Sequence, residues 1–281
     1  MSNNFRPNPK KEKLKRIASE TIDVINKGKY RINSIFEVDV TVGDSYLYEL
    51  TNKIDSFSLN VRKPNNLKIT LCKNTTYESI TKYSKDYPNS KIVVLNFASA
   101  KNPGGGFLNG SSAQEESLAR VSGLYKSLYR HKEFYEKSKK NPNNGLYYDL
   151  AIYSKDIPFI RDCDNEEIFI EPLHCDVITC AAVNSGVAIK SRVSEDIITL
   201  TMLNRIKTVI ELFIKESDPS RKNILILGAF GCGVFKNNPS TVAKAFNYVF
   251  DYYKDELSEL DLEINFSIPD DSNYFEFKRW I

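Results

Sequence analysis

The feature that most restricts the fold is a series of short apolar runs that alternate with segments of helical periodicity. Lys91–Phe97 (KIVVLNF) and Asn223–Leu227 (NILIL) are nearly continuous apolar runs of strand length, as expected for strands buried on both faces of a sheet. Further strands are expected at 67–71, 176–183 and 263–268, and helices from about 75, over 193–214 and over 240–253. The alternation predicts an α/β fold in which a mixed, largely parallel sheet lies between helices.

The first 66 residues differ from this pattern. Residues 1–12 are rich in Asn, Pro and Lys and lack apolar periodicity, which favours a disordered tail. A helical stripe follows from Leu14 to Ile25 and is ended by Gly28. We therefore expect a tail over 1–12, an N-terminal extension over 13–66 packed on the core, and a main domain over 67–281.

Charge and cysteine content limit the class of protein. The net charge of +3 over 281 residues neither requires nor excludes an anionic partner. The N-terminus lacks a signal peptide, and no window is apolar enough for a membrane span. The cysteines are odd in number, form no CxxC pair and have no zinc-ligand spacing, at positions 72, 163, 175, 180 and 232. We expect an intracellular protein (cytoplasmic, or nuclear in a eukaryote) without metal or cofactor.

A first glycine cluster, Gly104–Gly106, follows the strand expected at 91–97 and precedes a helix expected over about 112–130. In sheets of this kind, ligands bind at loops beyond the carboxyl ends of the strands. Glycines without Cβ atoms allow positive φ and the close approach of phosphate or ribose oxygens to backbone N–H groups. A flexible turn without a ligand is the alternative.

Two adjacent acids, Glu115 and Glu116, stand at the start of the expected helix, after Gln114. Ser112 and Glu115 match a capping box, so Glu115 has a structural explanation that Glu116 lacks. Neighbouring helical residues point about 100° apart. The two carboxylates therefore do not resemble the opposed pair of most glycosidases, and a single carboxylate would carry out both proton transfers.

A second glycine cluster, Gly228–Phe235 (GAFGCGVF), follows the strand at 223–227 and precedes another helix. Its spacing is neither the dinucleotide fingerprint nor the P-loop. A tight strand-to-helix turn explains it as well as a phosphate-binding loop does. Two glycine loops at one sheet edge suit a ligand with two adjacent phosphates, such as ADP-ribose.

The segment 102–125 (NPGGGFLNGSSAQEESLARVSGLY) places three glycines seven residues before Gln-Glu-Glu. This pattern resembles the signature of the poly(ADP-ribose) glycohydrolases, and the surrounding residues resemble the microbial type of that family. The resemblance covers about residues 67–270. It implies a macrodomain-like catalytic domain over 67–281, with a mixed sheet sandwiched between helices and an N-terminal helical extension.

The resemblance also implies residue roles. Glu116 would be the general acid and then the general base, and Glu115 would hold a ribose hydroxyl. Burial and a neighbouring carboxylate raise the pKa of such an acid, whereas a helix N-terminus lowers it. The residues expected to bind the ligand are Asn102, Gly104, Gly105, Gly106, Phe107, Gln114, Asn184, Gly231, Cys232, Gly233, Val234 and Phe235.

The implied reaction is hydrolysis of the ribose–ribose O-glycosidic bonds of poly(ADP-ribose) from the chain end, with ADP-ribose as product. Poly(ADP-ribose) or ADP-ribosylated proteins would be the substrates, and neither membrane nor DNA binding is expected. A reader that binds ADP-ribose without turnover is the alternative, and the intact acid pair disfavours it. A nucleotide-binding oxidoreductase is disfavoured because no early GxGxxG is present.

Overall fold

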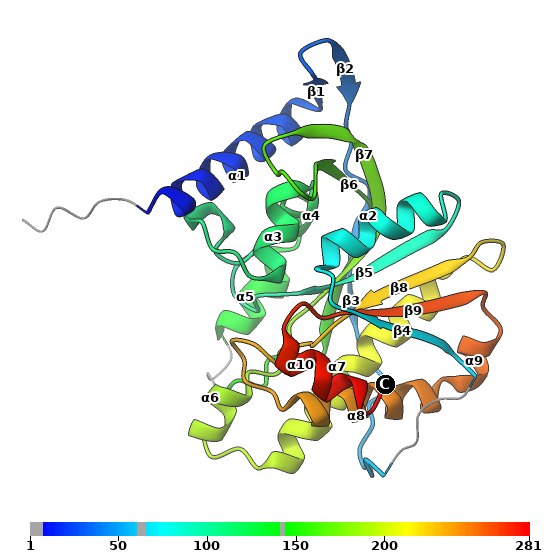
Figure 1. The fold of residues 1–281 in the computed structure, drawn as a ribbon. Helices are drawn as coiled ribbons and strands as arrows, with labels where there is room; N and C mark the ends of the chain where they lie inside the picture. Colours follow the sequence, from blue (N-terminus) through cyan, green and yellow to red (C-terminus); the bar gives the residue numbers. More distant parts are fainter. Residues whose placement is uncertain (1–7, 61–65, 141–143) are drawn as a thin grey trace, which may run out of the picture.

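The computed structural model describes residues 8–60, 66–140 and 144–281. At its centre is a seven-stranded mixed sheet with strand order β3-β6-β7-β5-β8-β9-β4 (Figure 1). The neighbours β7–β5–β8–β9–β4 run parallel, and β3–β6 and β6–β7 are antiparallel. The strands are β3 (Ser45–Glu49), β4 (Lys68–Cys72), β5 (Lys91–Phe97), β6 (Leu150–Arg161), β7 (Phe169–Cys180), β8 (Asn223–Leu227) and β9 (Leu262–Ser267).

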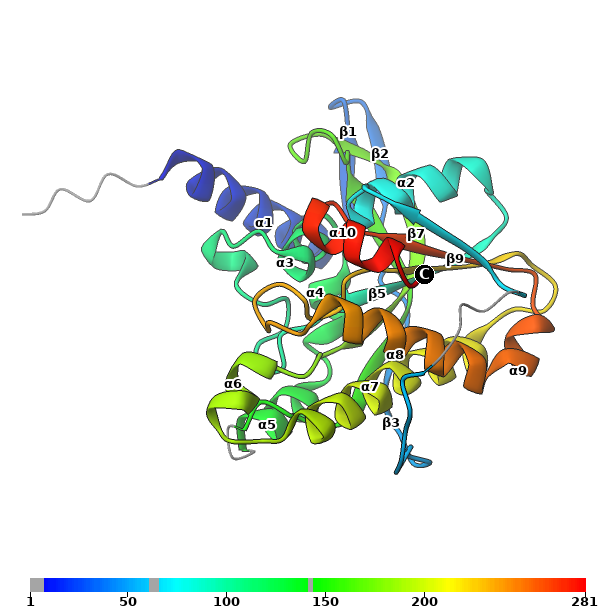
Figure 2. The same ribbon diagram turned by 60° about the horizontal axis from the view of Figure 1, so that its bottom comes forward.

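Helices cover both faces of this sheet (Figure 2). One face carries α2 (Thr76–Asp86), α3 (Gln114–Val121), α4 (Leu124–Leu128) and α5 (Lys132–Lys140). The other carries α7 (Glu195–Glu216), α8 (Pro239–Tyr252), α9 (Lys254–Ser258) and α10 (Asp271–Lys278). A short α6 (Ser185–Lys190) follows β7. This arrangement confirms the predicted fold class.

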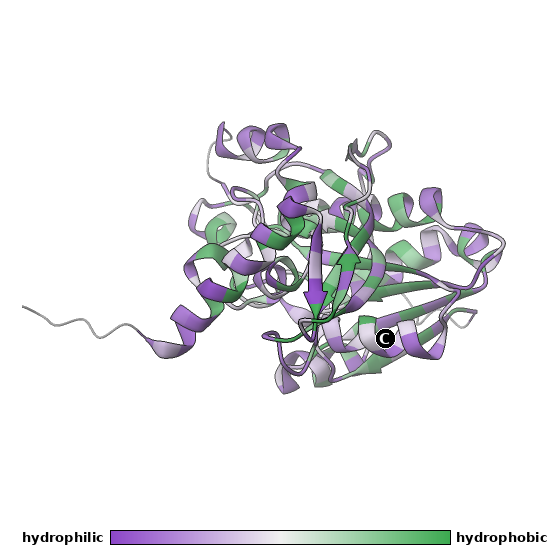
Figure 3. Cartoon of the chain, turned by 90° about the horizontal axis from the view of Figure 1, so that it is seen from above, coloured by the Kyte–Doolittle hydropathy of each residue, from purple (hydrophilic) through white to green (hydrophobic). Residues whose placement is uncertain are grey.

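The apolar strands owe their composition to burial on both faces. Along β5, Val93 and Leu95 join the core beneath α7 and α8, whereas Ile92 and Val94 join the core beneath α2. Every residue of β8 and β9 is buried. Figure 3 shows hydrophobic strands between helices in which hydrophilic and hydrophobic residues alternate along the chain. Two-sided burial explains why these strands read as continuous apolar runs.

The N-terminal extension contributes to the core. Helix α1 (Pro9–Lys27) is capped by Asn8 and ends at Gly28, which has a φ of 74°. Residues 9–12 are therefore helical, against the prediction of a tail, while residues 1–7 lie outside the described residues. A hairpin, β1 (Lys29–Ile32) and β2 (Phe36–Asp39), follows, and β3 forms an edge of the main sheet. The division at residue 66 stays a prediction.

The helix expected over 112–130 is instead two helices, α3 and α4. The break lies at Ser122, whose hydroxyl donates to Leu118 O and accepts from the Leu124 N–H. A side chain at Gly123 would meet Val42 and Pro158. The loop expected at 137–146 is also partly wrong, because α5 continues to Lys140 and residues 141–143 lie outside the described part.

Candidate active site

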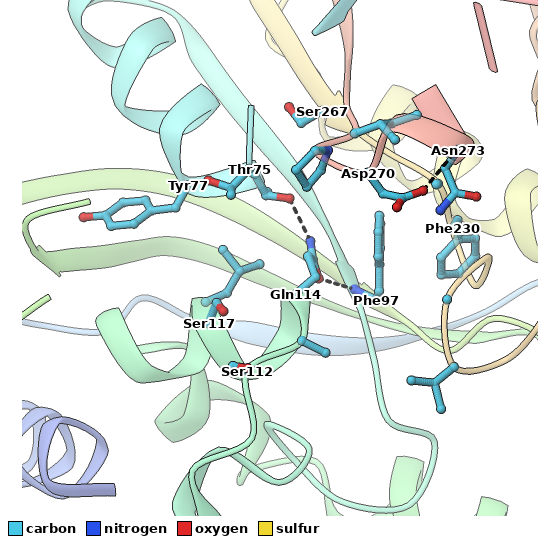
Figure 4. A pocket seen from close by; sticks show the side chains of 18 of the residues that line it. Thr75, Tyr77, Phe97, Ser112, Gln114, Ser117, Phe230, Ser267, Asp270 and Asn273 are labelled. Carbon is cyan, nitrogen blue, oxygen red and sulfur yellow. Dashed lines mark hydrogen bonds between the residues drawn. The ribbon is translucent and has the colours of Figure 1, made fainter. Parts of the chain in front are cut away.

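A cavity of about 500 Å³ opens at the carboxyl ends of β5, β8 and β9 (Figure 4). Its walls come from the first turns of α2 and α3, the loop after β8 and the start of α10. Phe97 and Phe230 lie on one side of it, with ring centroids 5.6 Å apart. The predicted residues that line it are Gln114, Gly231, Gly233, Val234 and Phe235. This volume is typical of a site for a small organic ligand.

The triple glycine lies beside this cavity, packed against the acid pair. Gly104 and Gly105 have φ values of 68° and 60°, in the left-handed region that favours glycine. A Cβ at Gly105 would lie 2.5 Å from Glu116 Oε1 and 3.1 Å from Glu115 Oε2. A Cβ at Gly106 would lie 2.6 Å from Ser111 Oγ. Gly105 thus packs closely on the carboxylates, while Gly104 packs on Phe107 and Ala119.

The N–H groups of this loop donate within the protein. Gly106 N–H donates to Glu116 Oε1 at 3.0 Å, and Gly105 N–H donates to the Asn102 carbonyl at 3.0 Å. The Gly104 N–H donates to Glu115. The expectation that these glycines present donors to a phosphate is not met in this structure, because the acids and the loop itself accept the bonds.

Glu115 is a buried carboxyl, with 3% of its surface exposed. It accepts the Ser99 N–H at 2.6 Å and the Asn96 side-chain amide at 3.4 Å. The predicted capping box is absent, because Ala113 is the N-cap of α3 and no side chain caps it. Burial, with a smaller contribution from Glu116, raises the pKa of Glu115 to about 8 despite the N–H donors. Burial therefore outweighs the donors and the helix N-terminus at this residue.

Glu116 is the more accessible member of the pair. It is partly exposed, and its carboxylate accepts a hydrogen bond from the Gly106 N–H. Although it follows Glu115 on the helix, both carboxylates reach the same Gly105. The two groups therefore act on one another electrostatically. Neither lines the cavity, although their neighbours on both sides along the helix, Gln114 and Ser117, do.

Gln114 joins the acid-bearing helix to the sheet (Figure 4). Its side-chain oxygen accepts the Phe97 N–H at 2.8 Å. Its amide donates to the Leu95 carbonyl at 2.8 Å and to Thr76 Oγ1 at 3.2 Å. The side chain thus fixes the start of α3 against β5 and α2. These bonds show that Gln114 supports the local structure, whereas its contact with a ligand stays a prediction.

The second glycine loop keeps its N–H groups available. A Cβ at Gly231, where φ is 73°, would lie 2.5 Å from Asn237 Nδ2, whereas a Cβ at Gly233 would meet nothing within 4 Å. Among the described residues, none accepts a hydrogen bond from the N–H of Gly233, Val234 or Phe235. Successive free N–H groups in a turn form an anion-binding concavity. The donors expected for a diphosphate are on this loop.

The side chain of Asn237 stabilises that loop through hydrogen bonds. Its amide donates to Val183 O at 2.7 Å and to Gly231 O at 2.9 Å, and its oxygen accepts the Ser185 hydroxyl. The side chain is 5% exposed. The sequence analysis missed this residue, because an asparagine after a glycine loop carries no signal of its partners.

The remaining predicted residues differ in their surroundings. Phe107 is 1% exposed and packs on Tyr125 and Ala119, so its ring belongs to the core, away from any ligand. Cys232 is mostly enclosed, and burial raises the pKa of its thiol to about 12. Asn184 caps α6 by accepting the Val187 N–H. None of these three side chains lines the cavity.

Two residues on the rim are exposed. Val234, which was expected to bind the ligand, is 83% exposed beside the cavity, whereas Phe230 is fully buried. Asn102 is also exposed, and its carbonyl closes the first glycine loop. Further cavity residues that the sequence analysis left without a role are Ser267, Pro269, Asp270 and Asn273.

The described residues contain neither a membrane-crossing helix nor a metal-binding group of three His, Cys, Asp or Glu side chains. No helix of that part of the chain is both long and apolar enough to span a bilayer. No such group of side chains is assembled there either.

The sheet order, the two glycine loops and the paired glutamates define a macrodomain-like α/β enzyme. The family described as microbial-type poly(ADP-ribose) glycohydrolase (PARG), catalytic domain, matches residues 18–162. The chain belongs to this family, which makes it a poly(ADP-ribose) glycohydrolase. A search of curated proteins gave no match.

Solved structures agree with this assignment. Poly(ADP-ribose) glycohydrolase from Thermomonospora curvata, bound to the inhibitor ADP-HPD, is 28% identical, with a TM-score of 0.78 over 95% of this chain and 99% of that chain. The enzyme from Deinococcus radiodurans in complex with ADP-ribose is 31% identical, with a TM-score of 0.65 over 78% of this chain and 85% of that one. The predicted family is confirmed.

Proposed function

We propose that Glu116 is the general acid and base of the reaction. It would protonate the leaving ribose 2′-oxygen as an oxocarbenium-like ribose develops, and would then take a proton from the attacking water. The observation that carries this proposal is the contrast in burial within the pair. Glu115 is enclosed by backbone donors, whereas Glu116 is partly exposed and holds the Gly106 N–H.

Glu115 would act as the partner of Glu116. With a pKa of about 8, Glu115 holds a proton at neutral pH in the free protein. Coupled carboxyls titrate as a pair, so the pair enters the reaction with a proton available for the leaving group. The Ser99 N–H keeps Glu115 fixed, and a ribose hydroxyl that reaches the pair would meet Glu115 from the side of Gly105.

The diphosphate of the terminal unit would lie on the second glycine loop. Support comes from the free N–H groups of Gly233, Val234 and Phe235 and from the open space at Gly233. Phe235 would then direct the distal ribose towards Glu116, and the adenosine would occupy the remaining cavity. Gly104–Gly106 would line the sugar end mainly by holding the acids in place.

The biological substrate would be poly(ADP-ribose), free or attached to proteins, cleaved from the chain end inside the cell. The Deinococcus radiodurans complex with ADP-ribose supports ADP-ribose as the ligand class. A cavity of about 500 Å³ has the size of a site for one ADP-ribose unit. Direct DNA binding and membrane binding are not expected.

The test compares Glu116→Gln with Glu115→Gln on purified polymer. Release of ADP-ribose should fall by at least about 100-fold in Glu116→Gln, because a lost general acid costs roughly that much, while the Kd for ADP-ribose stays within about threefold. An active Glu116→Gln protein would overturn the assignment. Oligomeric products early in the reaction would overturn cleavage from the end, and a wild-type protein that binds without turnover would indicate a reader.

A further inference from the structure

Six non-glycine residues of the described chain have a left-handed backbone: Asn33, Ser34, Tyr147, Asp156, Arg192 and Lys236. Such conformations cost free energy and persist where the surroundings fix them. Four have local explanations. Asn33 and Ser34 form the turn between β1 and β2, Asp156 lies at a bulge in β6, and Arg192 follows the end of α6. Tyr147 and Lys236 remain.

These two residues flank one side chain of the site. Lys236 directly follows Phe235, and the ring of Tyr147 lies against the ring of Phe235, with centroids 6.1 Å apart and an angle of 44° between the planes. Phe235 lines the cavity, whereas Tyr147 contacts it from behind. Both segments with a strained backbone therefore support the same side chain of the cavity wall, the ring of Phe235.

The loop that carries Tyr147 is held on its N-terminal side. The Gly145 carbonyl accepts the Asn184 N–H at 2.8 Å, and the Leu146 carbonyl accepts Arg205 Nη2 at 3.0 Å. Arg205 is fully buried and also holds the carbonyl of Ala181. A side chain at Gly145 would lie 2.5 Å from the Asn184 carbonyl, so the loop packs directly on the end of β7.

The loop of Phe235 is fastened to the same strand end. The Phe235 carbonyl accepts the Gly186 N–H at 3.1 Å, and Asn237 ties its own loop to the Val183 carbonyl. The residues that follow β7 thus anchor both partners of the ring contact. A ring fixed by its backbone and by a second ring has little freedom to turn.

We propose that Tyr147 is a positioning residue for the hydrolysis, acting through Phe235. The Tyr147 ring is held in place by a strained and anchored backbone and sets the orientation of the Phe235 ring. That orientation in turn sets the position of the distal ribose relative to Glu116. The inference rests on the proposed function, in which Phe235 directs that ribose. It predicts that Tyr147 affects turnover more than affinity, since misplacement of a reacting group costs rate.

The experiment removes the Tyr147 ring in two ways. Tyr147→Gly fits the observed φ without strain, so the loop can keep its course, and Tyr147→Ala provides a second deletion. We expect kcat on polymer to fall about tenfold to a hundredfold in both, with the Kd for ADP-ribose within about threefold. Tyr147→Phe should retain most of the activity, because the ring makes the contact.

The matched control is Tyr148→Ala. Tyr148 is the next residue and is also partly buried, but its ring packs against the ammonium of Lys137, whereas the ring of Tyr147 packs against Phe235. Its removal should leave kcat within about twofold. A loss in Tyr148→Ala equal to that in Tyr147→Gly would overturn the inference, because general damage to the loop would then explain both.

A double-mutant cycle with Phe235→Ala gives the decisive reading. If Tyr147 acts through Phe235, Tyr147→Gly adds less than about twofold to the loss in Phe235→Ala. Independent, multiplicative losses would overturn the inference while leaving the proposed function intact. Full activity of Phe235→Ala alone would instead overturn the role of Phe235 in the proposed function.

Discussion

Gly105 and Glu116 are in such close contact that no side chain fits between them. A Cβ on Gly105 would lie 2.5 Å from Glu116 Oε1, well inside the distance that carbon and oxygen atoms tolerate. The neighbouring Gly106 N–H then donates to the same oxygen. The glycine loop therefore fixes the position of the Glu116 carboxylate through close packing at Gly105 and the hydrogen bond from Gly106.

Gly105→Ala should abolish hydrolysis. The alanine must adopt a φ of 60° and displace Glu116, so we expect kcat to fall by about 100-fold or more and the free energy of unfolding to fall by about 1–3 kcal/mol. Release of ADP-ribose and urea denaturation measure the two effects. Gly110→Ala is the control, because Gly110 has a φ of 76° and a close contact with Lys11, away from the carboxylates. It should lose stability but keep turnover.

Gly233→Ala should weaken ligand binding without a loss of stability. A Cβ there would meet no protein atom within 4 Å, and its φ is not in the left-handed region. We expect an unchanged melting temperature and a Kd for ADP-ribose raised about tenfold, because the added methyl group would keep the diphosphate from hydrogen-bonding distance of the N–H groups. Calorimetric titration measures the Kd. An unchanged Kd would place the diphosphate elsewhere.

Asn237→Ala should release the second glycine loop. It removes the side-chain donors to Val183 O and Gly231 O, and of these two carbonyls only Gly231 O keeps a second donor within the described residues, the backbone N–H of residue 237, so we expect a cost of about 1–3 kcal/mol of stability. The Kd for ADP-ribose should rise as well, because the N–H groups lose their arrangement. Asn238→Ala removes only the cap of α8, which costs about 1 kcal/mol. Equal affinities in the two variants would contradict a role for Asn237 in binding.

Glu115→Gln should change the dependence of stability on pH. The pKa of Glu115 is raised from 4.5 to about 8 in the folded protein, so the folded state binds more protons than the unfolded state between these values. The contribution of Glu115 to stability is full below about pH 4.5 and is lost as pH rises towards 8. Glutamine cannot ionise, so the free energy of unfolding of the variant should rise relative to that of the wild type over this range, by up to a few kcal/mol.

Urea denaturation at pH 5 and pH 8.5 measures this difference. Glu256→Gln, on the exposed side of α9, is the control for a general loss of one negative charge. A wild-type protein whose stability relative to Glu115→Gln does not decline between the two pH values would show that Glu115 is not buried as a neutral acid.

Much of the fold was predictable because burial on two sides produces a readable pattern. β5 and β8 have the predicted bounds, and the layered architecture followed from the alternation of strands and helices. The break at Ser122 was not predictable, because it depends on a bridge to Phe159, which is distant in the sequence. Helix α10 was missed for a similar reason, since it docks on α8 and β4 instead of showing a strong apolar stripe.

The sequence alone determined the family and the two glycine loops beside the acid pair, because Gln-Glu-Glu after three glycines and a second glycine loop are local patterns. Tertiary structure decided what each of them does. It turned the Gly106 N–H towards Glu116, made Glu115 the buried partner and left the N–H groups of Gly233, Val234 and Phe235 without an acceptor among the described residues. It also placed Tyr147 behind Phe235. Burial and hydrogen-bond direction depend on which distant segments meet, and no local pattern encodes that.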